Sequence, residues 1–146
     1  MMTPSQNTSG KQTPLTLAIL PERLGICRLP PDTEVPGWAH SKGFSSITRT
    51  TDVLSLVCRL DCIPPEVRCE RDWRAFRVVG TLDFSLTGIL SMLSGVLADA
   101  GISLFALSTF DTDYLLVRSG QLPQAIQAYV AAGLTVLDEG SEHPSS

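Results

Sequence analysis

Two amphipathic helix patterns alternate with strand patterns in the second half of the chain, and this order restricts the fold more than any other feature. Residues Thr87 to Gly101 place apolar side chains on one face with helical spacing, and a glycine suits the position just past a helix end. Gln121 to Ala132 repeats the pattern, with Pro123 near its start and Gly133 after its end. Short apolar runs that predict strands cover residues 73–82, 102–109, 114–117 and 134–137. The order β-α-β-β-α-β predicts a ferredoxin-like α+β fold with an antiparallel sheet.

The first half predicts strands but no helix of comparable length. Four apolar runs cover residues 15–20, 24–29, 44–50 and 53–60. Pro30 to Lys42 stands where the first helix of a βαββαβ unit would be, and it leaves room for only one helical turn. Residues 61–71 include Pro64 and Pro65 and predict a linker. We therefore expect the first half to be a reduced version of the second.

A short internal repeat supports this duplication. Phe44 to Leu54 aligns with Phe105 to Leu115 at an offset of 61 residues (109 − 48 = 61). Between the matching ends, this alignment pairs Thr48 with Thr109, Thr51 with Thr112, and Asp52 with Asp113. Each copy places a Thr-x-x-Thr-Asp turn between two apolar strands. The predicted organisation is a flexible tail at 1–14, a degenerate N-terminal module at 15–70, a complete module at 71–138 and a second tail at 139–146.

Charge and hydropathy exclude several classes of partner. The 146 residues carry a formal net charge of −4 and contain no basic cluster, which argues against nucleic acid and against an anionic membrane surface. No apolar run reaches the length of a transmembrane helix, and residues 1–14 lack the apolar core of a signal peptide. We expect a cytoplasmic protein with no membrane partner.

Neither a metal site nor a catalytic centre is predicted. The four cysteines are Cys27, Cys58, Cys62 and Cys69, and without a sign of secretion we expect them to be thiols. They form no C-x-x-C pair, and neither His40 nor His143 lies near them in sequence. We find no Ser-His-Asp or Cys-His grouping and no cofactor fingerprint, so we expect no cofactor and no enzymatic activity.

The stretch from Phe84 to Val117 resembles the ACT domain family. It combines a strand, a turn with glycine, a helix, and a strand that ends in Ser-Thr-Phe before Asp. Leu107 to Phe110, with Asp113, is similar to the ACT modules of Castor-type cytosolic arginine sensors and of small bacterial ACT proteins. The resemblance covers residues 73–137 well and the first half only at 44–58. It implies a regulatory protein that binds a free amino acid between modules and acts on a separate partner protein.

The resemblance also implies a set of ligand contacts. They are Leu86, Thr87 and Gly88 at the start of the first helix, and Thr109, Phe110 and Asp113 on the following hairpin. The internal repeat adds Thr48 and Asp52 as further candidate contacts. Helix-start N–H groups suit a ligand carboxylate, glycine permits close approach, and an aspartate suits an ammonium. The arginine-sensing relatives carry an acidic residue where this chain has Leu86, which is a departure from the pattern for a cationic side chain.

Each of these residues also has a purely structural interpretation. Thr87 could cap the helix, and Asp52 and Asp113 could bond their own turns. Two functional hypotheses follow. In the first, the chain is an amino-acid-binding regulatory homo-oligomer, most simply a dimer joined along sheet edges. In the second, it is a ligand-free dimerisation or protein-interaction scaffold with the same fold.

Overall fold

A computed structural model describes residues 15–79 and 88–139, which form a mixed α+β fold. Its strands are β1 (Thr16–Ile19), β2 (Leu24–Leu29), β3 (Ser46–Arg49), β4 (Leu54–Arg59), β5 (Cys69–Val78), β6 (Phe105–Ser108), β7 (Asp113–Arg118) and β8 (Thr135–Asp138). Two α-helices, α1 (Ile89–Asp99) and α2 (Leu122–Ala131), are accompanied by 3-10 turns η3 (Gly37–Ala39), η4 (Leu60–Cys62) and η5 (Ser119–Gln121). None of the described helices is long and apolar enough to cross a membrane.

The predicted ferredoxin-like α+β class is confirmed, and each described strand and α-helix overlaps a predicted one. Gly101 and Gly133 follow the two helices with φ angles of 76° and 97°, the left-handed conformation expected there. One prediction was wrong in part: residues 69–71 were assigned to a linker, but they begin β5. The strand was missed because Cys69 to Asp72 is mostly polar and shows no apolar run.

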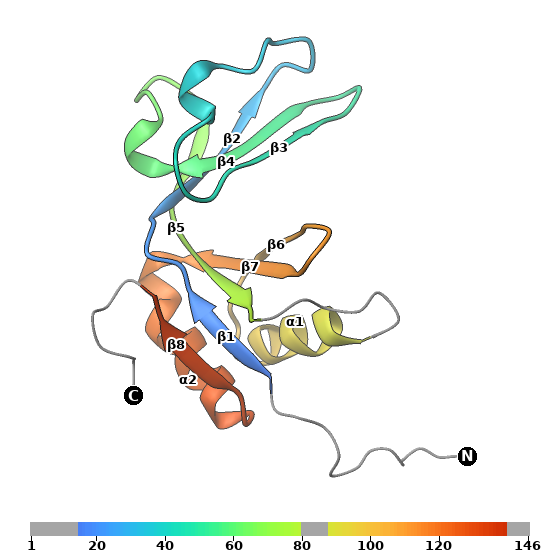
Figure 1. Cartoon of the computed structure of the whole chain (residues 1–146), viewed down its shortest axis with the longest axis vertical. Coiled ribbons are helices and arrows are strands. Elements are labelled where there is room, and N and C mark those ends of the chain that lie inside the picture. Colours follow the sequence, from blue (N-terminus) through green and yellow to red (C-terminus); the bar gives the residue numbers. More distant parts are fainter. Residues whose placement is uncertain (1–14, 80–87, 140–146) are drawn as a thin grey trace.

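The sheet of the second half has a fifth strand inserted into the ferredoxin-like order. Its strands run β8-β1-β5-β7-β6, so that β1, from the start of the chain, lies between β5 and β8 (Figure 1). The β1–β8 pair is parallel, and the other described pairs are antiparallel. The division of the chain at residue 70 stays a prediction, but β1 pairs with strands of the second half.

A single long strand, β5, joins the two halves. Its first residues, from Cys69, pair with β2, which continues through β4 to β3. Its last residues, up to Val78, pair with β1 on one edge, and residues 73–77 pair with β7 on the other. The first half therefore extends the same sheet, and Figure 1 shows it at one end of β5 with the helices at the other.

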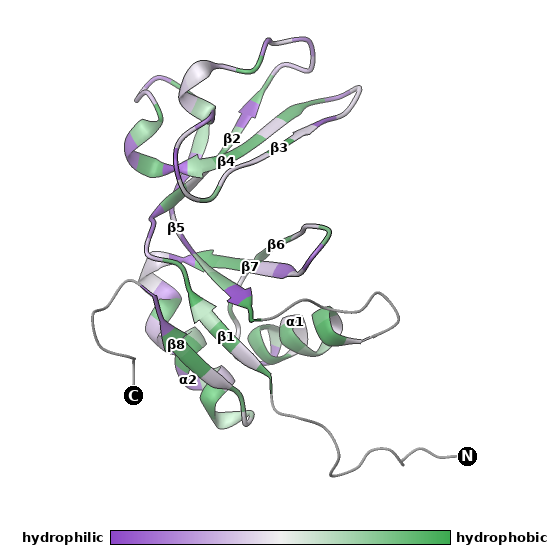
Figure 2. Cartoon of the chain, viewed as in Figure 1, coloured by the Kyte–Doolittle hydropathy of each residue, from purple (hydrophilic) through white to green (hydrophobic). Residues whose placement is uncertain are grey.

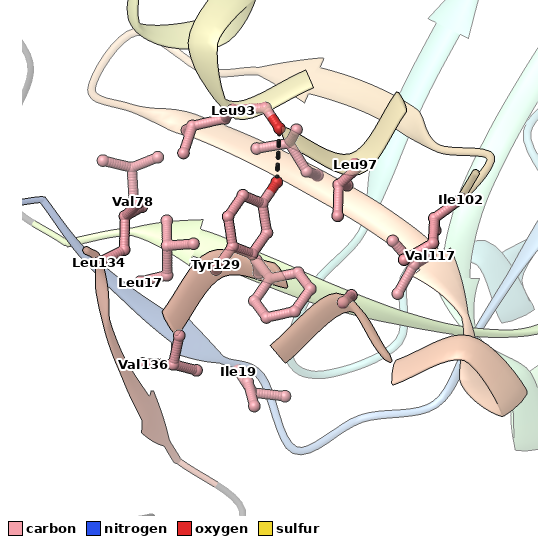
Figure 3. Packing of buried hydrophobic residues seen from close by; sticks show 13 residues of the cluster. Leu17, Ile19, Val78, Leu93, Leu97, Ile102, Val117, Tyr129, Leu134 and Val136 are labelled. Carbon is pink, nitrogen blue, oxygen red and sulfur yellow. Dashed lines mark hydrogen bonds between the residues drawn. The ribbon is translucent and has the colours of Figure 1, made fainter. Parts of the chain in front are cut away.

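The main hydrophobic core lies between α1, α2 and the sheet of the second half. Figure 2 shows the hydrophobic residues that α1, β1 and β8 contribute. Tyr129 of α2 is fully buried there, and its hydroxyl donates a 2.9 Å hydrogen bond to the carbonyl of Leu93 in α1 (Figure 3). Its ring meets Phe76 edge-on, with centroids 5.1 Å apart. Burial raises the pKa of Tyr129, so the hydroxyl stays a donor that ties the helices together.

A second apolar cluster packs the two halves against each other on the opposite face of the sheet. It contains Trp73 of β5, Leu116 of β7 and Val57 of β4. Phe44, just before β3, lies against Tyr114 of β7 with ring centroids 4.8 Å apart. The halves are thus held by side-chain packing as well as by the shared strand. A third cluster, which includes Cys27 and Cys58, fills the first half beneath η3 and η4.

The structure corrects the register of the internal repeat. Ser46 pairs with Val57 at the start of one hairpin, and Phe105 pairs with Leu116 at the start of the other. The two hairpins therefore correspond at an offset of 59 residues (105 − 46 = 59), not 61. Thr50 replaces Thr48 as the counterpart of Thr109. The motif-based alignment failed because it matched residue types across the turn, whereas strand pairing determines which positions are equivalent.

The sheet bends at Asp72 of β5, where a β-bulge lies. Leu24 of β2 faces Trp73 and Gly25 faces Arg71, so Asp72 has no residue opposite it. Asp72 is the one non-glycine residue in the described ranges with a positive φ, 75°. Arg23 donates two hydrogen bonds to its carboxylate, at 2.8 and 2.6 Å, and Ser119 donates a third at 2.7 Å. The bond from Arg23, followed by that from Ser119, lowers the pKa of Asp72.

Substitutions at Asp72 separate the backbone cost from the side-chain contribution. We expect Asp72→Ala to be less stable than Asp72→Gly by about 1 kcal/mol, because only glycine adopts the left-handed conformation without a Cβ penalty. Urea unfolding measures the difference, and equal stability of the two variants would contradict a strained bulge.

The same variants test how the contribution of the Asp72 carboxylate to stability depends on pH. The folded pKa of Asp72 lies below its ordinary value, so the contribution of the carboxylate is present above about pH 4. It is lost as the pH falls through the lower, folded pKa. We expect the stability difference between the parent and Asp72→Gly to shrink below about pH 4, whereas the difference between Gly and Ala stays constant. A parent–Gly gap that is unchanged in acid would contradict the ionic role.

Candidate functional site

The first part of the predicted ligand site is the start of α1. Gly88 caps this helix in the left-handed conformation, with φ 85°, and no side chain in the described ranges caps it. A Cβ placed on Gly88 would meet no described atom within 4 Å. The first N–H groups of a helix have no intrahelical acceptor, and they carry the positive end of the helix dipole. The predicted contacts Leu86 and Thr87 lie outside the described residues.

The second part is the turn between β6 and β7, and its threonines have structural roles. Thr109 accepts hydrogen bonds at its hydroxyl from the backbone N–H groups of Asp111, at 3.2 Å, and Thr112, at 3.3 Å. Its own N–H donates to the carbonyl of Thr112 at 2.9 Å. The hydroxyl of Thr112 is buried and donates to the carbonyl of Val78, at 2.8 Å. This bond attaches the turn to the end of β5. The sequence identified Thr112 only as a match in the internal repeat, and nothing in the neighbouring sequence indicates that its hydroxyl is buried.

Two predicted contacts on this hairpin present groups that could face a ligand. Phe110 stands at the tip of the turn and is 81% exposed. Asp113 begins β7 directly opposite Ser108 of β6, whose hydroxyl donates a 2.6 Å hydrogen bond to one carboxylate oxygen. Ser108 was not predicted as a site residue, but it orients the Asp113 carboxylate. Figure 1 shows this turn and the start of α1 at the same end of the second half.

The structure does not bring Thr48 and Asp52 to this end within one chain. Both lie on the β3–β4 hairpin, whose tip is well separated from that of β6–β7 (Figure 1). In the corrected register, Asp52 corresponds to Asp111, not Asp113, and Thr48 corresponds to Leu107. Asp52 donates its backbone N–H to the hydroxyl of Thr50 at 3.0 Å, as Asp111 does to Thr109. The two turns thus share one local geometry.

Open pockets occur in the first half and at its junction with the second. One of about 560 Å³ is bordered by Glu22 and Arg23 from the β1–β2 connection and by Arg59 and Asp61. Its charges are largely paired: Arg59 lies 2.8 Å from Asp61, and Arg23 binds Asp72. A second, of about 490 Å³, includes Asp52 in its border. In the described ranges, no group of three or more histidine, cysteine, aspartate or glutamate side chains is arranged to hold a metal ion.

Comparisons with known proteins identify related chains along most of the sequence. The family model of the ACT domain matches residues 68–128, and a second model, described as an N-terminal domain, matches residues 22–66. An X-ray structure of a protein from Agobacterium tumefaciens has 41% sequence identity and a TM-score of 0.83, covering 90% of this chain and 98% of that one. No curated protein shows significant similarity.

More distant solved structures share the fold. A protein of unknown function from Vibrio cholerae, described as a possible transport protein, is 15% identical with a TM-score of 0.67, covering 80% of this chain and 88% of its own. The regulatory subunit of aspartate kinase from Thermus flavus is 13% identical with a TM-score of 0.59, covering 82% of this chain and 99% of its own. These likenesses, together with the family model and the β5-α1-β6-β7-α2-β8 arrangement, agree with the resemblance seen in the sequence. The chain therefore belongs to the ACT domain family.

Proposed function

We propose that this protein is a regulatory module that binds a free amino acid at an interface between ACT units and passes its occupancy to a separate partner protein. The ACT domain is a regulatory fold that binds small ligands, which supports the general class. The observation that carries the proposal is the glycine-capped start of α1 at the same end as the β6–β7 turn that precedes Asp113. In this proposal the protein acts in the cytoplasm and has no catalytic role of its own.

The two charged groups of an amino acid match these two structural features. The first N–H groups of α1, which have no acceptor within the helix, suit the ligand carboxylate, and Gly88 lets it approach the backbone. Asp113, oriented by Ser108, suits the ammonium group. Phe110 supplies an apolar wall for the ligand side chain. Leu86 and Thr87 complete the site in this proposal.

Three of the predicted contacts take different places in the proposed site. The Thr109 hydroxyl is occupied by its own turn, so we assign it to holding the loop that carries Phe110. Thr48 and Asp52 lie too far along the first half to join the site within one chain. They would contribute only from another copy, which places the proposed site between chains.

A thermal-shift screen against the twenty free amino acids at about 1 mM tests the proposal. A ligand with a dissociation constant near 10 μM would stabilise the fold by about 2.7 kcal/mol, which raises the melting temperature by several degrees. We expect one amino acid, or one chemical class of them, to stabilise the protein selectively. A flat response across all twenty would contradict the proposal.

Paired substitutions on one turn show whether the response arises at this site. We expect Asp113→Asn to abolish the ligand-dependent shift, because it removes the charge that would pair with the ammonium group. Asp111→Asn is the matched control, since Asp111 is an exposed carboxylate on the same turn. Loss of the shift in both variants, or in neither, would argue against the assigned role of Asp113.

We also propose that the protein forms a homodimer through the edge of β8. This strand ends the sheet and pairs with β1 alone among the described strands. Leu137 on β8 and Val130 on α2 are large apolar side chains that are exposed on the isolated chain. An open strand edge with apolar neighbours favours pairing with a second copy. This surface would serve equally in a ligand-free scaffold, the second candidate function.

Substitution of Leu137 tests this interface. We expect Leu137→Lys to shift a dimer to monomer in analytical ultracentrifugation, because it places a charge in the apolar contact. Ile47→Lys is the matched control, since Ile47 lies on another edge strand, β3, with 41% exposure against 38% for Leu137. A dimer that survives Leu137→Lys would exclude the β8 edge. If Leu137→Lys breaks the dimer and the parent protein shows no thermal response to any amino acid, the ligand-free scaffold would be favoured.

A further inference from the structure

Three of the four cysteines lie together on one face of the sheet in the first half. β2 runs between β4 and β5, and each of these three strands contributes one thiol: Cys27 from β2, Cys58 from β4 and Cys69 from β5. All three belong to the apolar cluster beneath η3 and η4. The fourth, Cys62, is separate from them on η4. Cys27, Cys58 and Cys69 are far apart in sequence, and the pairing of their strands brings them together.

Cys27 and Cys58 are both buried. The neighbouring Cys58 thiol, followed by burial, raises the pKa of Cys27, whereas the neighbouring Cys27 thiol lowers the pKa of Cys58. The thiol of Cys69 donates a hydrogen bond to the carbonyl oxygen of Glu70, at 3.4 Å. Cys27 stands in the middle of the cluster, within reach of two other sulfur atoms.

The backbone register places Cys27 and Cys69 at a favourable distance for a disulfide bond. They face each other on antiparallel strands. The next pair along, Arg28 and Arg68, is joined by a backbone hydrogen bond of 3.1 Å. Hydrogen-bonded and non-hydrogen-bonded pairs alternate, so Cys27 and Cys69 form a non-hydrogen-bonded pair, with Cα atoms about 4.5 Å apart. Disulfides span Cα separations of roughly 4.4 to 6.8 Å.

Gly25 provides the space that the Cys69 sulfur occupies. A Cβ placed on Gly25 would lie 2.8 Å from the Sγ atom of Cys69 and 2.4 Å from the Cδ1 atom of Ile63. A side chain at this position of β2 would therefore displace the thiol. Because Gly25 has no side chain, Cys69 can lie over β2, beside Cys27.

Cys69 also offers a route from solvent to the cluster. It is partly exposed, in contrast to the buried Cys27 and Cys58. A small oxidant can therefore reach Cys69 from solvent, and Cys27 lies opposite it on the neighbouring strand.

We propose that Cys69 and Cys27 form a reversible oxidation site for small peroxides. The Cys69 thiolate attacks one peroxide oxygen, so that an S–O bond forms, the O–O bond breaks and hydroxide leaves as water. Cys27 then attacks the Cys69 sulfur, the S–S bond forms and the S–O bond breaks. The departing hydroxide takes the proton of Cys27 and leaves as a second water. Two thiols and one peroxide give one disulfide and two waters, and an external dithiol reverses the reaction.

The disulfide would act on the part of the fold that joins the two halves. It would link β2 to the start of β5 and close the loop between residues 27 and 69, which contains the whole β3–β4 hairpin. Cross-linking a loop restricts the unfolded chain and stabilises the folded one. Oxidation would therefore hold the first half more firmly against the shared strand.

Mass spectrometry of the full chain after hydrogen peroxide treatment tests the proposal. We expect the folded, reduced protein to lose about 2 Da, the mass of two hydrogens, and to recover it with dithiothreitol. Peptide mapping of the unsubstituted protein should show a Cys27–Cys69 link within one chain. The oxidised form should melt several degrees higher than the reduced form.

Single substitutions identify the reacting thiols. We expect Cys69→Ser to abolish the 2 Da loss and Cys62→Ser, the matched control with a partly exposed thiol, to retain it. The role of Cys27 is tested by peptide mapping of the unsubstituted protein. This measurement does not require a folded variant of this buried residue. An unchanged mass, a link from Cys27 to Cys58, a link to Cys62 or between chains, or oxidation of Cys69 to a sulfinic acid without a link would each overturn the proposal.

Discussion

The shared strand β5 is the constraint on which the rest of this structure depends. Its first residues pair with β2, its last residues pair with β1, and its other edge pairs with β7. The two halves therefore cannot rotate freely, because any large rotation would break backbone hydrogen bonds within one sheet. The bulge at Asp72 provides the bend between them, and Arg23 and Ser119 hold that bend through its carboxylate. A signal that passes between the halves must act on this bend or on the apolar cluster beside it.

The inserted strand β1 makes the second unit dependent on the start of the chain. Leu17 and Ile19 of β1 are buried in the core beneath α1 and α2, next to Tyr129. Without β1, the strand β8 would lose its described pairing partner and the core would lose these side chains. The two halves therefore share strands and core side chains, although the family models match them separately.

The sequence predicted what is local and missed what depends on long-range pairing. The helices were found because their apolar spacing is visible within a few turns, as are Gly101 and Gly133 at their ends. The position of β1 between β5 and β8 was not predicted, because a short apolar run carries no information about which strands will pair with it. The repeat register was wrong for the same reason, because Thr48 and Thr50 are equally good matches to Thr109 until pairing separates them. Asp72 gave no signal of its left-handed conformation, which glycine or asparagine would have indicated.

The candidate site shows how structure changes the role of a predicted residue. Thr109 and Thr50 both use their hydroxyl groups to accept the N–H groups of their own turns, so a shared turn geometry explains the presence of threonine in both hairpins. That explanation does not extend to Asp113, whose counterpart in the first half is the buried Leu54. Asp113 carries a charge at a position where the other hairpin has an apolar residue, and a local structural requirement common to both hairpins cannot account for it. The difference between the two hairpins at this position therefore supports the proposed role of Asp113.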